Sequence, residues 1–270
     1  MTIVHASAVI ETGAQLAADV EIGPGCVVGA KVRMASGVKL GPHVVVLGET
    51  EIGAGTVVHS HAVLGGSAQY RGDAGDGARL VIGAGNVIRE HVTMNSGTAK
   101  GGGITQVGDN GYFMAYSHVA HDCHVGNTVT FANAAALGGH CVVGDGVNIG
   151  GLSAVLQFVR IGRNAFVSGI AGVQSDVIPF GLAIGAPAAL EGLNVVGLKR
   201  SGIGHDRLHA LRAAYRYIFR GPGLFKDRVG EAAERWPSSP EVSEVLAFIR
   251  AASKRPICMP ARNSVDTGRD

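Results

Sequence analysis

Large apolar residues recur at every sixth position along most of this 270-residue chain. One run extends from Val4 to Leu64, a second contains Ile82, Ile88 and Met94, and a third extends from Val107 to Val173. A period of six matches neither the 3.6-residue repeat of an amphipathic helix nor the two-residue alternation of a strand. It matches the hexapeptide repeats of a β-helix, in which a short strand and a turn alternate around a prism. The sequence therefore predicts an all-β solenoid of hexapeptide repeats.

The number of faces decides which residues lie above one another. If three repeats close one coil, the coil contains 18 residues, and stacked strands lie ~4.8 Å apart. Residues that are 18 apart in an unbroken run then share one column. The usual preference of parallel crossovers would favour a right-handed wind.

Two polar, glycine-rich segments interrupt the repeat, at 66–80 and 95–106. The first keeps the phase, because Leu64 and Ile82 are 18 positions apart, whereas the second shifts the phase by one. We interpret both as loops that leave the prism. Loops on a rigid scaffold often carry function, although a tolerated insertion would have the same composition.

The repeat stops after Pro179 and Pro187. The segment 206–220, "DRLHALRAAYRYIFR", then has apolar residues at helical spacing, and 226–252 predicts more helix with a break at 236–240. We expect the tail after Arg255 to fray. The sequence thus predicts a β-helix over 1–190 and a small helical domain over 191–270.

The composition indicates where in the cell the protein is located. The four cysteines form no CxxC pair and indicate a reducing, cytoplasmic location. The first 16 residues do not resemble a secretory signal. The uncharged segment 124–144 is long enough for a bilayer, but its short polar period indicates a soluble repeat without stable membrane insertion.

Charge is divided unevenly between the two parts. Residues 191–270 carry 14 Lys/Arg and 9 Asp/Glu, a balance of +5, whereas residues 1–190 carry 9 and 12, a balance of −3. A basic domain suits an acidic partner. Nucleic acid is not the expected partner, because stacking aromatics and known binding modules are missing from this segment.

Three histidines, an aspartate and a cysteine lie together in one stretch, 117–127, "SHVAHDCHVGN". A step of 18 from His121 leads to Gly139 and then to Gln157, and a step of 18 from Asp122 leads to His140. A base, a position without a side chain and exposed backbone N–H groups would then lie within ~5–10 Å of one another. This arrangement is typical of acyl transfer.

A metal site and a purely structural role compete with acyl transfer as explanations of these side chains. His118, His121 and His124 are half a repeat apart, so they cannot all converge within one chain, and a metal would need ligands from a neighbouring subunit. The cysteines of the repeat, Cys26, Cys123 and Cys141, share one position that often holds small residues, which indicates core filling. Any single histidine could also be a solvated edge residue. We expect no metal.

Four motifs identify a family. "HVAHDC" (118–123), "LGGH" (137–140), "GGLSAVLQF" (150–158) and "LNVVGLKR" (193–200) resemble the UDP-N-acetylglucosamine O-acyltransferases that begin lipid A synthesis. "REHVTMNSGT" and "GGGITQVGDN" agree as well, and the resemblance covers nearly the whole chain.

The resemblance implies a homotrimer of left-handed β-helices with active sites in the clefts between subunits. It implies transfer of a 3-hydroxyacyl chain from acyl carrier protein to the 3-hydroxyl of the sugar, with no cofactor beyond the phosphopantetheine of the carrier. In this family the residue that matches His121 is the general base, a role suited to histidine. Asp122 supports the base, and the backbone N–H of Gly139 holds the oxyanion.

The resemblance also implies substrate contacts. His118, His140 and Gln157 match positions that contact the nucleotide sugar or the acyl donor, and Asn194 and Arg200 match positions near uridine and pantetheine. Asn194 could instead cap a turn, and Arg200 could be a solvated charge.

Two further positions concern acyl length and the divergent loop. Gly169 matches the position that measures acyl length and, without a side chain, predicts a deep groove for a long chain; it could equally be an ordinary repeat glycine. Gln69, with Arg71, is the candidate sugar or phosphate contact in the loop 66–80.

The sequence departs from the family at several positions. Leu156 stands where a histidine is common, Asn95 and Ser96 replace a His-Arg pair, and the loop 66–80 differs throughout. These departures leave open a UDP 3-amino sugar acceptor, which would give an amide. Three competing classes of protein are the related N-acyltransferase, which usually has an extra amino-terminal domain, a metal-dependent hexapeptide enzyme and a scaffold without activity.

Overall fold

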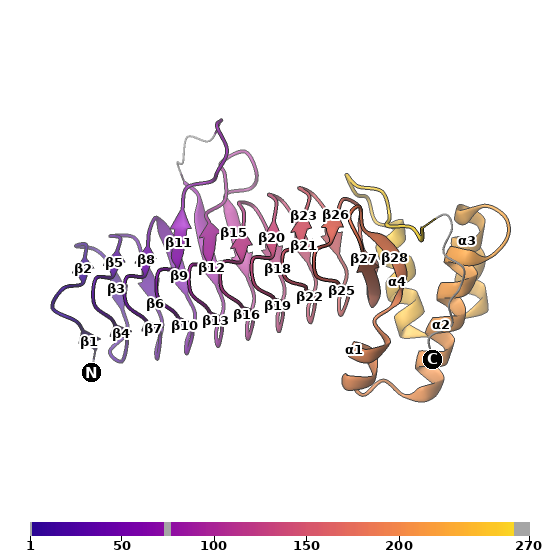
Figure 1. Ribbon diagram of the computed structural model, residues 1–270, viewed down its shortest axis with the longest axis horizontal. Helices are drawn as coiled ribbons and strands as arrows, with labels where there is room; N and C mark the ends of the chain where they lie inside the picture. The colour runs from indigo at the N-terminus through magenta and orange to yellow at the C-terminus, as the bar shows by residue number, and fades with distance from the viewer. Residues whose placement is uncertain (1, 73–76, 262–270) are drawn as a thin grey trace.

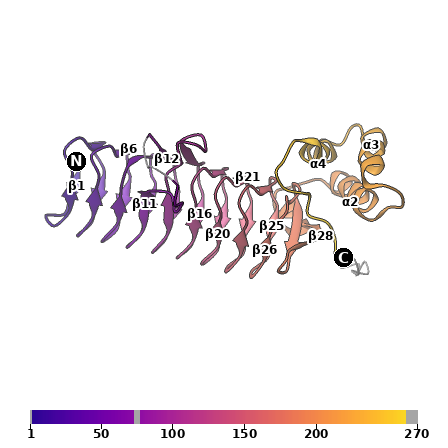
Figure 2. The same ribbon diagram turned by 90° about the horizontal axis from the view of Figure 1, so that it is seen from above.

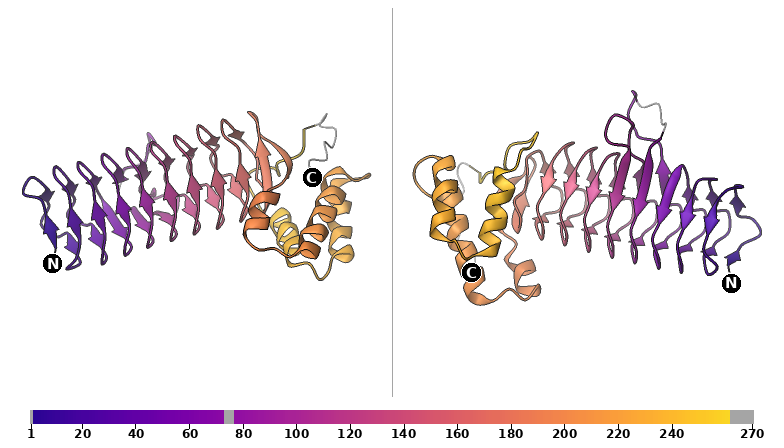
Figure 3. Two further views of the ribbon diagram at one scale, coloured as in Figure 1. Left: turned by 60° about the horizontal axis from the view of Figure 1, so that its bottom comes forward. Right: turned by 180° about the vertical axis from the view of Figure 1, so that it is seen from behind.

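The protein is a long three-sided prism followed by a group of helices. The computed structural model describes residues 2–72 and 77–261. In Figure 1 the coils stack from the N-terminal end on the left to the helices on the right, and Figures 2 and 3 show the same stack from other directions. The predicted solenoid with a helical C-terminal part is confirmed, and the coil winds left-handed, as the resemblance implies.

Three sheets form the faces of the prism. The first face has eleven strands: β1 (Ile3–Val4), β4 (Glu21–Ile22), β7 (Lys39–Leu40), β10 (Val57–Val58), β13 (Val87–Ile88), β16 (Tyr112–Phe113), β19 (Thr130–Phe131), β22 (Asn148–Ile149), β25 (Phe166–Val167), β27 (Gly181–Ile184) and β28 (Ala189–Leu193). The second face has nine: β2 (Val9–Ile10), β5 (Val27–Val28), β8 (Val45–Val46), β11 (Val63–Gly66), β14 (Thr93–Asn95), β17 (His118–Val119), β20 (Ala136–Leu137), β23 (Ala154–Val155) and β26 (Gly172–Val173). The third face has eight: β3 (Gln15–Leu16), β6 (Arg33–Met34), β9 (Glu49–Ile52), β12 (Arg79–Ile82), β15 (Ile104–Val107), β18 (His124–Val125), β21 (Val142–Val143) and β24 (Arg160–Ile161).

The register confirms the 18-residue coil. His118 pairs with Ala136, and Ala136 pairs with Ala154, each through parallel hydrogen bonding. The faces are parallel throughout except for β27 and β28, which form an antiparallel pair at the end of the first face.

The repeat residues form the core. Each residue of the six-residue series from Ile22 to Val173 is at most 4% exposed. The cause is the alternation of a strand, which turns the first side chain of each pair outward and the second inward. Phe113 and Phe131 fill the middle of the prism, with ring centroids 5.0 Å apart. Full burial of each such side chain contributes about 1.5–3 kcal/mol, and the series therefore accounts for much of the hydrophobic stabilisation.

Turns between the faces form three edges. We call the turns from the first face to the second the Ile170 edge, those from the second to the third the His121 edge, and those from the third to the first the Asn164 edge. Both loops leave the prism at the His121 edge: the first, described at 67–72 and 77–78, between β11 and β12, and the second, at 96–103, between β14 and β15. They protrude together at the top of Figure 1. The second insertion accounts for the phase shift, because Thr93 pairs with His118, 25 positions on instead of 18.

Four helices follow the prism: α1 (Val195–Arg200), α2 (His205–Arg220), α3 (Phe225–Arg235) and α4 (Pro240–Arg250). The apolar positions that predicted α2 are buried, at Leu208, Leu211, Tyr215, Ile218 and Phe219. Pro240 begins α4, and the Ser239 side chain caps it by accepting from the backbone N–H of Val242. No helix within 2–72 and 77–261 has the length and apolarity needed to span a membrane.

The expectation of a frayed tail after Arg255 is wrong for the first part of the tail. The backbone N–H of Asp176 donates to the carbonyl of Pro256, and that of Cys258 donates to the carbonyl of Asp176, both at 2.8 Å. Cys258 is also buried, so this segment is part of the fold. We call residues 253–259 the C-terminal strap. The last residues of the predicted tail, 262–270, lie outside the described residues.

Candidate active site

The predicted column lies on the His121 edge. The backbone N–H of His140 donates to the carbonyl of His121, and that of Phe158 donates to the carbonyl of Gly139, both at 3.0 Å. Consecutive coils therefore place His121, Gly139 and Gln157 at the same turn position. Asp122, His140 and Phe158 occupy the next position, each with a left-handed backbone at φ values of 59°, 61° and 67°.

The imidazole of His121 lies across Gly139. A Cβ on Gly139 would be 2.5 Å from Cε1 and 2.6 Å from Nε2 of His121, so a side chain at Gly139 would displace the ring. The Gly139 N–H donates to no acceptor in the described part of the chain. Next to the imidazole there is thus a backbone donor that is free to bind a ligand oxygen.

Asp122 fixes the orientation of His121. Its Oδ2 lies 2.8 Å from Nδ1 of the imidazole. A carboxylate can only accept, so Nδ1 carries a proton, and in the neutral imidazole Nε2 is then the nitrogen with the free lone pair. Nε2 lies close to Gly139, 2.6 Å from the position that a Cβ would take there, and it is the ring nitrogen that can accept a proton.

The loop 96–103 holds Asp122 in turn. The backbone N–H of Thr98 donates to Oδ1 at 2.9 Å, and the Thr98 hydroxyl donates to Oδ2 at 2.7 Å. Burial alone would raise the pKa of Asp122, but the hydrogen bonds from Thr98 and His121 outweigh burial and hold the pKa below its usual value. Asp122, which is only 3% exposed, is therefore a charged carboxylate at neutral pH.

Sequence reasoning missed three contributions to this site. Thr98 was not among the predicted residues, although it belongs to one of the two predicted loops. Thr105 accepts a hydrogen bond from the backbone N–H of Asp122 at 2.8 Å. The ring of Tyr70, from the other loop, lies 6.1 Å from the ring of His121. The repeat pattern contained no signal for these contacts because they come from residues outside the repeat.

Two further histidines lie beside the pair. Nδ1 of His118 is 2.7 Å from the Thr93 hydroxyl, and burial lowers the pKa of His118 below its usual value. His140 lies edge-on to His121, with ring centroids 5.1 Å apart, and its Nε2 is 3.7 Å from Oδ2 of Asp122. Burial lowers the pKa of His140, although Asp122 opposes the shift. Both imidazoles are neutral at neutral pH and serve as hydrogen-bonding groups.

The remaining predicted residues divide between the His121 edge and other places. Gln157 is exposed at the top of the column, and Gln69 is exposed beside Tyr70 in the loop. Gly169 lies on the Ile170 edge, where a Cβ would be 3.3 Å from the carbonyl of Gly151. Arg200 is exposed in the last turn of α1. Gly169 and Arg200 therefore do not join His121 at its edge of the prism.

Asn194 has a structural role that the sequence left open. Its Oδ1 accepts from the backbone N–H of Gly197 at 2.9 Å and caps α1, and its Nδ2 donates to the carbonyl of Asn164 at 3.0 Å. The side chain is thus attached to the Asn164 edge rather than to the His121 edge. A contact with uridine stays a prediction.

The histidines and cysteines also bear on metal binding. His118 lies on the second face and His124 on the third, on either side of His121, so these three do not converge. His121, Asp122 and His140 offer ligand atoms that all lie within 4.8 Å of one another, but both Asp122 oxygens already accept hydrogen bonds. The thiols of Cys26, Cys123 and Cys141 are buried and donate to backbone carbonyls. Binding a metal would require rearrangement of the Asp122 contacts.

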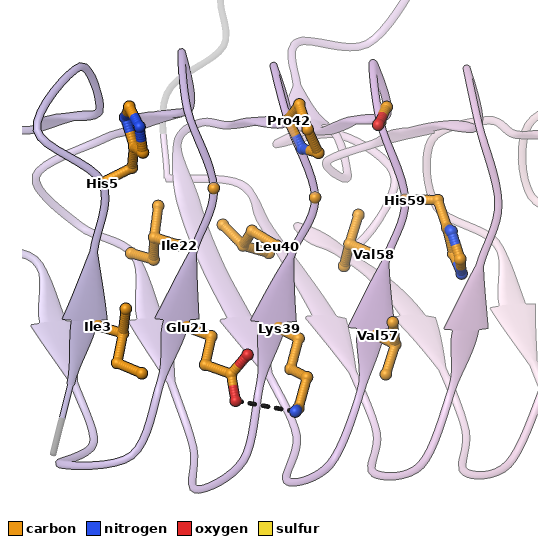
Figure 4. Close-up of a pocket in the computed structure, with 13 residues that line it drawn as sticks. Ile3, His5, Glu21, Ile22, Lys39, Leu40, Pro42, Val57, Val58 and His59 are labelled. Carbon is orange, nitrogen blue, oxygen red and sulfur yellow. Dashed lines mark ion pairs between the residues drawn. The ribbon is translucent and has the colours of Figure 1, made fainter.

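A separate hollow lies elsewhere on the prism. It has a volume of about 470 Å³ on the first face and is bordered by Ile3, Leu40 and Val57, with the ion pair of Glu21 and Lys39 crossing it at 2.8 Å (Figure 4). It contains none of the predicted site residues. The site on the His121 edge is recognised by its chemistry rather than by its volume, since His121 and Asp122 are themselves buried.

The prism and the arrangement on its His121 edge define the class of the protein: a left-handed β-helical acyltransferase built from hexapeptide repeats. Residues 176–258 match the family model described as Udp N-acetylglucosamine O-acyltransferase, domain 2. An acyl-[acyl-carrier-protein]--UDP-N-acetylglucosamine O-acyltransferase of Rhizobium johnstonii is 46% identical over 259 residues, which cover 96% of this chain and 95% of that protein. The protein of the same description from Paracoccus denitrificans is 52% identical over 186 residues, 69% of this chain and 70% of that protein.

Solved structures agree with the sequence comparison. The UDP-N-acetylglucosamine acyltransferase of Campylobacter jejuni superimposes with a TM-score of 0.90 at 37% identity, over 96% of this chain and all of that chain. The enzyme of Francisella novicida has a TM-score of 0.93 at 31% identity, over 98% and 97% of the two chains. The chain belongs to the family of UDP-N-acetylglucosamine O-acyltransferases.

Proposed function

We propose that this protein transfers a 3-hydroxyacyl chain from acyl carrier protein to the 3-hydroxyl of UDP-N-acetylglucosamine, the first step of lipid A biosynthesis. The names of its relatives support the substrates. The observation that carries the chemistry is the position of the His121 imidazole, whose Nδ1 lies 2.8 Å from the Asp122 carboxylate and whose ring lies against Gly139.

Each residue of this group has a defined step. Nε2 of His121 accepts the proton of the sugar hydroxyl while the oxygen attacks the thioester carbonyl. The Gly139 N–H donates to the oxyanion of the tetrahedral intermediate. When the C–S bond breaks, the imidazolium returns the proton to the pantetheine sulfur, and the products are the sugar ester and the carrier thiol. Asp122 stabilises the imidazolium between these two steps.

The remaining contacts concern the substrates. Neutral His118 and His140, together with Gln157 and Gln69, are suited to hydrogen-bond the sugar or the donor near His121. Asn194, Arg200 and Gly169 lie away from this edge and can contribute only if a second chain brings them there. We therefore propose a homotrimer with sites between chains, in which Gly169 leaves room for a long acyl chain.

The proposal extends to partners and location. The carboxy-terminal part, with its balance of +5, suits an acidic carrier, because complementary charge raises encounter rates. The phosphopantetheine belongs to the carrier, and the protein itself needs no cofactor for the steps above. We place the reaction in the cytoplasm on the basis of the cysteine usage.

The test is direct. Purified protein is incubated with UDP-N-acetylglucosamine and with carriers that bear 3-hydroxyacyl chains of several lengths, and the products are identified by mass spectrometry. We expect an O-acylated nucleotide sugar, whereas acylation only of the UDP 3-amino sugar would identify the amine as the acceptor.

A matched pair of variants tests the base. His121→Ala should lower the rate by about 10²–10⁴-fold. His124→Ala removes an exposed histidine from the third face and should leave the rate within about twofold. An unchanged rate in His121→Ala would contradict the assignment of the base.

A further inference from the structure

A lysine from the far end of the chain lies on the same column as Asp122. His140 follows Asp122 by one coil, and Phe158 follows His140 by another, with their rings stacked at 4.5 Å and an angle of 9°. The ammonium of Lys254 then lies 4.0 Å above the Phe158 ring. The order along the edge is carboxylate, imidazole, phenyl ring and ammonium.

The C-terminal strap holds Lys254 there. Its neighbour Arg255 donates from Nε to the carbonyl of Gln157 at 2.8 Å. Beyond Arg255, Pro256 and Cys258 are hydrogen-bonded to the backbone of Asp176. The strap is drawn in yellow beside β26 at the upper right of Figure 1. The backbone of Lys254 is therefore anchored on one side, unlike that of a typical surface lysine.

The charge of Lys254 is not neutralised by the protein. No carboxylate in the described residues lies within ion-pair distance of its ammonium. Lys254 is close enough to His140 to lower the pKa of the imidazole by charge repulsion. Its side chain is exposed. A ligand that lies along the column thus meets an available positive charge about 14 Å beyond the Asp122 turn, because two coils separate Asp122 from Phe158 and the ammonium lies 4.0 Å from that ring.

We propose that Lys254 binds a phosphate group of a substrate at the end of this column. The inference rests on the proposed function, in which both substrates carry phosphate, one as the diphosphate of the nucleotide and the other as the phosphodiester of the carrier's pantetheine. An ammonium above an aromatic ring is attracted to the ring face and keeps N–H donors on its other side, where a phosphate oxygen can accept them. Lys254 is a binding residue that supplies charge, and it takes no part in proton transfer.

Two substitutions separate charge from packing. Lys254→Met keeps the aliphatic stem against Phe158 and removes the charge, whereas Lys254→Arg keeps the charge. Lys31→Met, at an exposed lysine in the turn between β5 and β6 and outside the basic C-terminal part, is the matched control. Thermal unfolding of all three variants shows whether the strap is still in place.

The KM for each substrate is measured with the other at saturation. Lys254→Met should raise one KM by about tenfold, the usual effect of losing one charge-assisted hydrogen bond, with kcat within about twofold. A rise in the KM for UDP-N-acetylglucosamine would identify the nucleotide phosphates as the group that Lys254 binds. A rise in the KM for the carrier would identify the pantetheine phosphate instead. Lys254→Arg should restore most of the affinity, and Lys31→Met should match the wild type.

A second measurement needs no turnover. Calorimetric titration with UDP should give weaker binding in Lys254→Met if the nucleotide phosphates are the ligand. If both KM values stay within about twofold of the wild type at low salt, where charge effects are largest, the inference is overturned even though the enzyme acylates its substrate. A wild-type protein without acyl transfer would instead contradict the proposed function.

Discussion

The imidazole of His121 occupies the space that a side chain on Gly139 would need, with a Cβ there only 2.5 Å from Cε1 of the ring. Glycine at 139 therefore allows the His121 ring to lie against the next coil. Substitutions on this edge and in the segments beside it should change activity and stability in four measurable ways.

The first prediction concerns this contact. Gly139→Ala should push the imidazole off its position and lower kcat by about 10²-fold, since a displacement of 1 Å in a reacting group has this effect. Gly172→Ala is the control, because a Cβ at Gly172 meets its nearest neighbour at an ordinary 3.4 Å. Steady-state kinetics and thermal unfolding check both variants. An active Gly139→Ala enzyme would show that the ring position is unimportant.

The second prediction concerns the loop that holds Asp122. Thr98→Val removes the hydroxyl donor to Oδ2, so the pKa of Asp122 should rise towards its usual value and kcat should fall by about tenfold. Thr128→Val removes a single hydroxyl bond, to the carbonyl of Asn127, on the Asn164 edge and should leave kcat unchanged. Comparison of the two kcat values is the measurement. Equal values would mean that Thr98 does not support the catalytic pair.

The third prediction concerns two site residues that lie far apart in one chain, His121 on its edge of the prism and Arg200 in α1. If the site forms between chains, co-expressed His121→Ala and Arg200→Ala subunits should form mixed assemblies with activity well above that of either parent. Some sites then combine an intact His121 from one chain with an intact Arg200 from another. The measurement is the activity of purified mixed assemblies, each chain carrying a different tag. Mixed assemblies no more active than the parents would place both residues in a site of one chain.

The fourth prediction concerns pH. Burial holds the folded-state pKa of His118 below its unfolded value of about 6.5. Between these two values the unfolded chain binds more protons, so stability rises with pH. The contribution is complete above about pH 6.5 and declines as the pH falls towards the folded-state pKa. Chemical denaturation at several pH values should show this decline, and His118→Gln should make it smaller. An identical pH dependence in the variant would exclude His118 as a cause.

The repeat made the prism predictable from the sequence. Each coil needs an apolar side chain at every inward position, and this requirement produces the six-residue series. The series gives the 18-residue register, and the register places His121, Gly139 and Gln157 in one column. The apolar spacing of 206–220 likewise predicted α2. The amide above His121 was foreseeable because the glycine and the register are both visible in the chain.

The tertiary structure alone decided the surroundings of that column. Thr98 lies 24 positions before Asp122, and Lys254 belongs to a tail that the sequence indicated was frayed. Neither belongs to the repeat, and no local pattern predicts where a loop or a tail will dock. The structure also showed that Asn194 caps α1 and donates to the carbonyl of Asn164 rather than lying beside His121. Local periodicity determines a column, whereas contacts between segments that are distant in sequence determine what surrounds it.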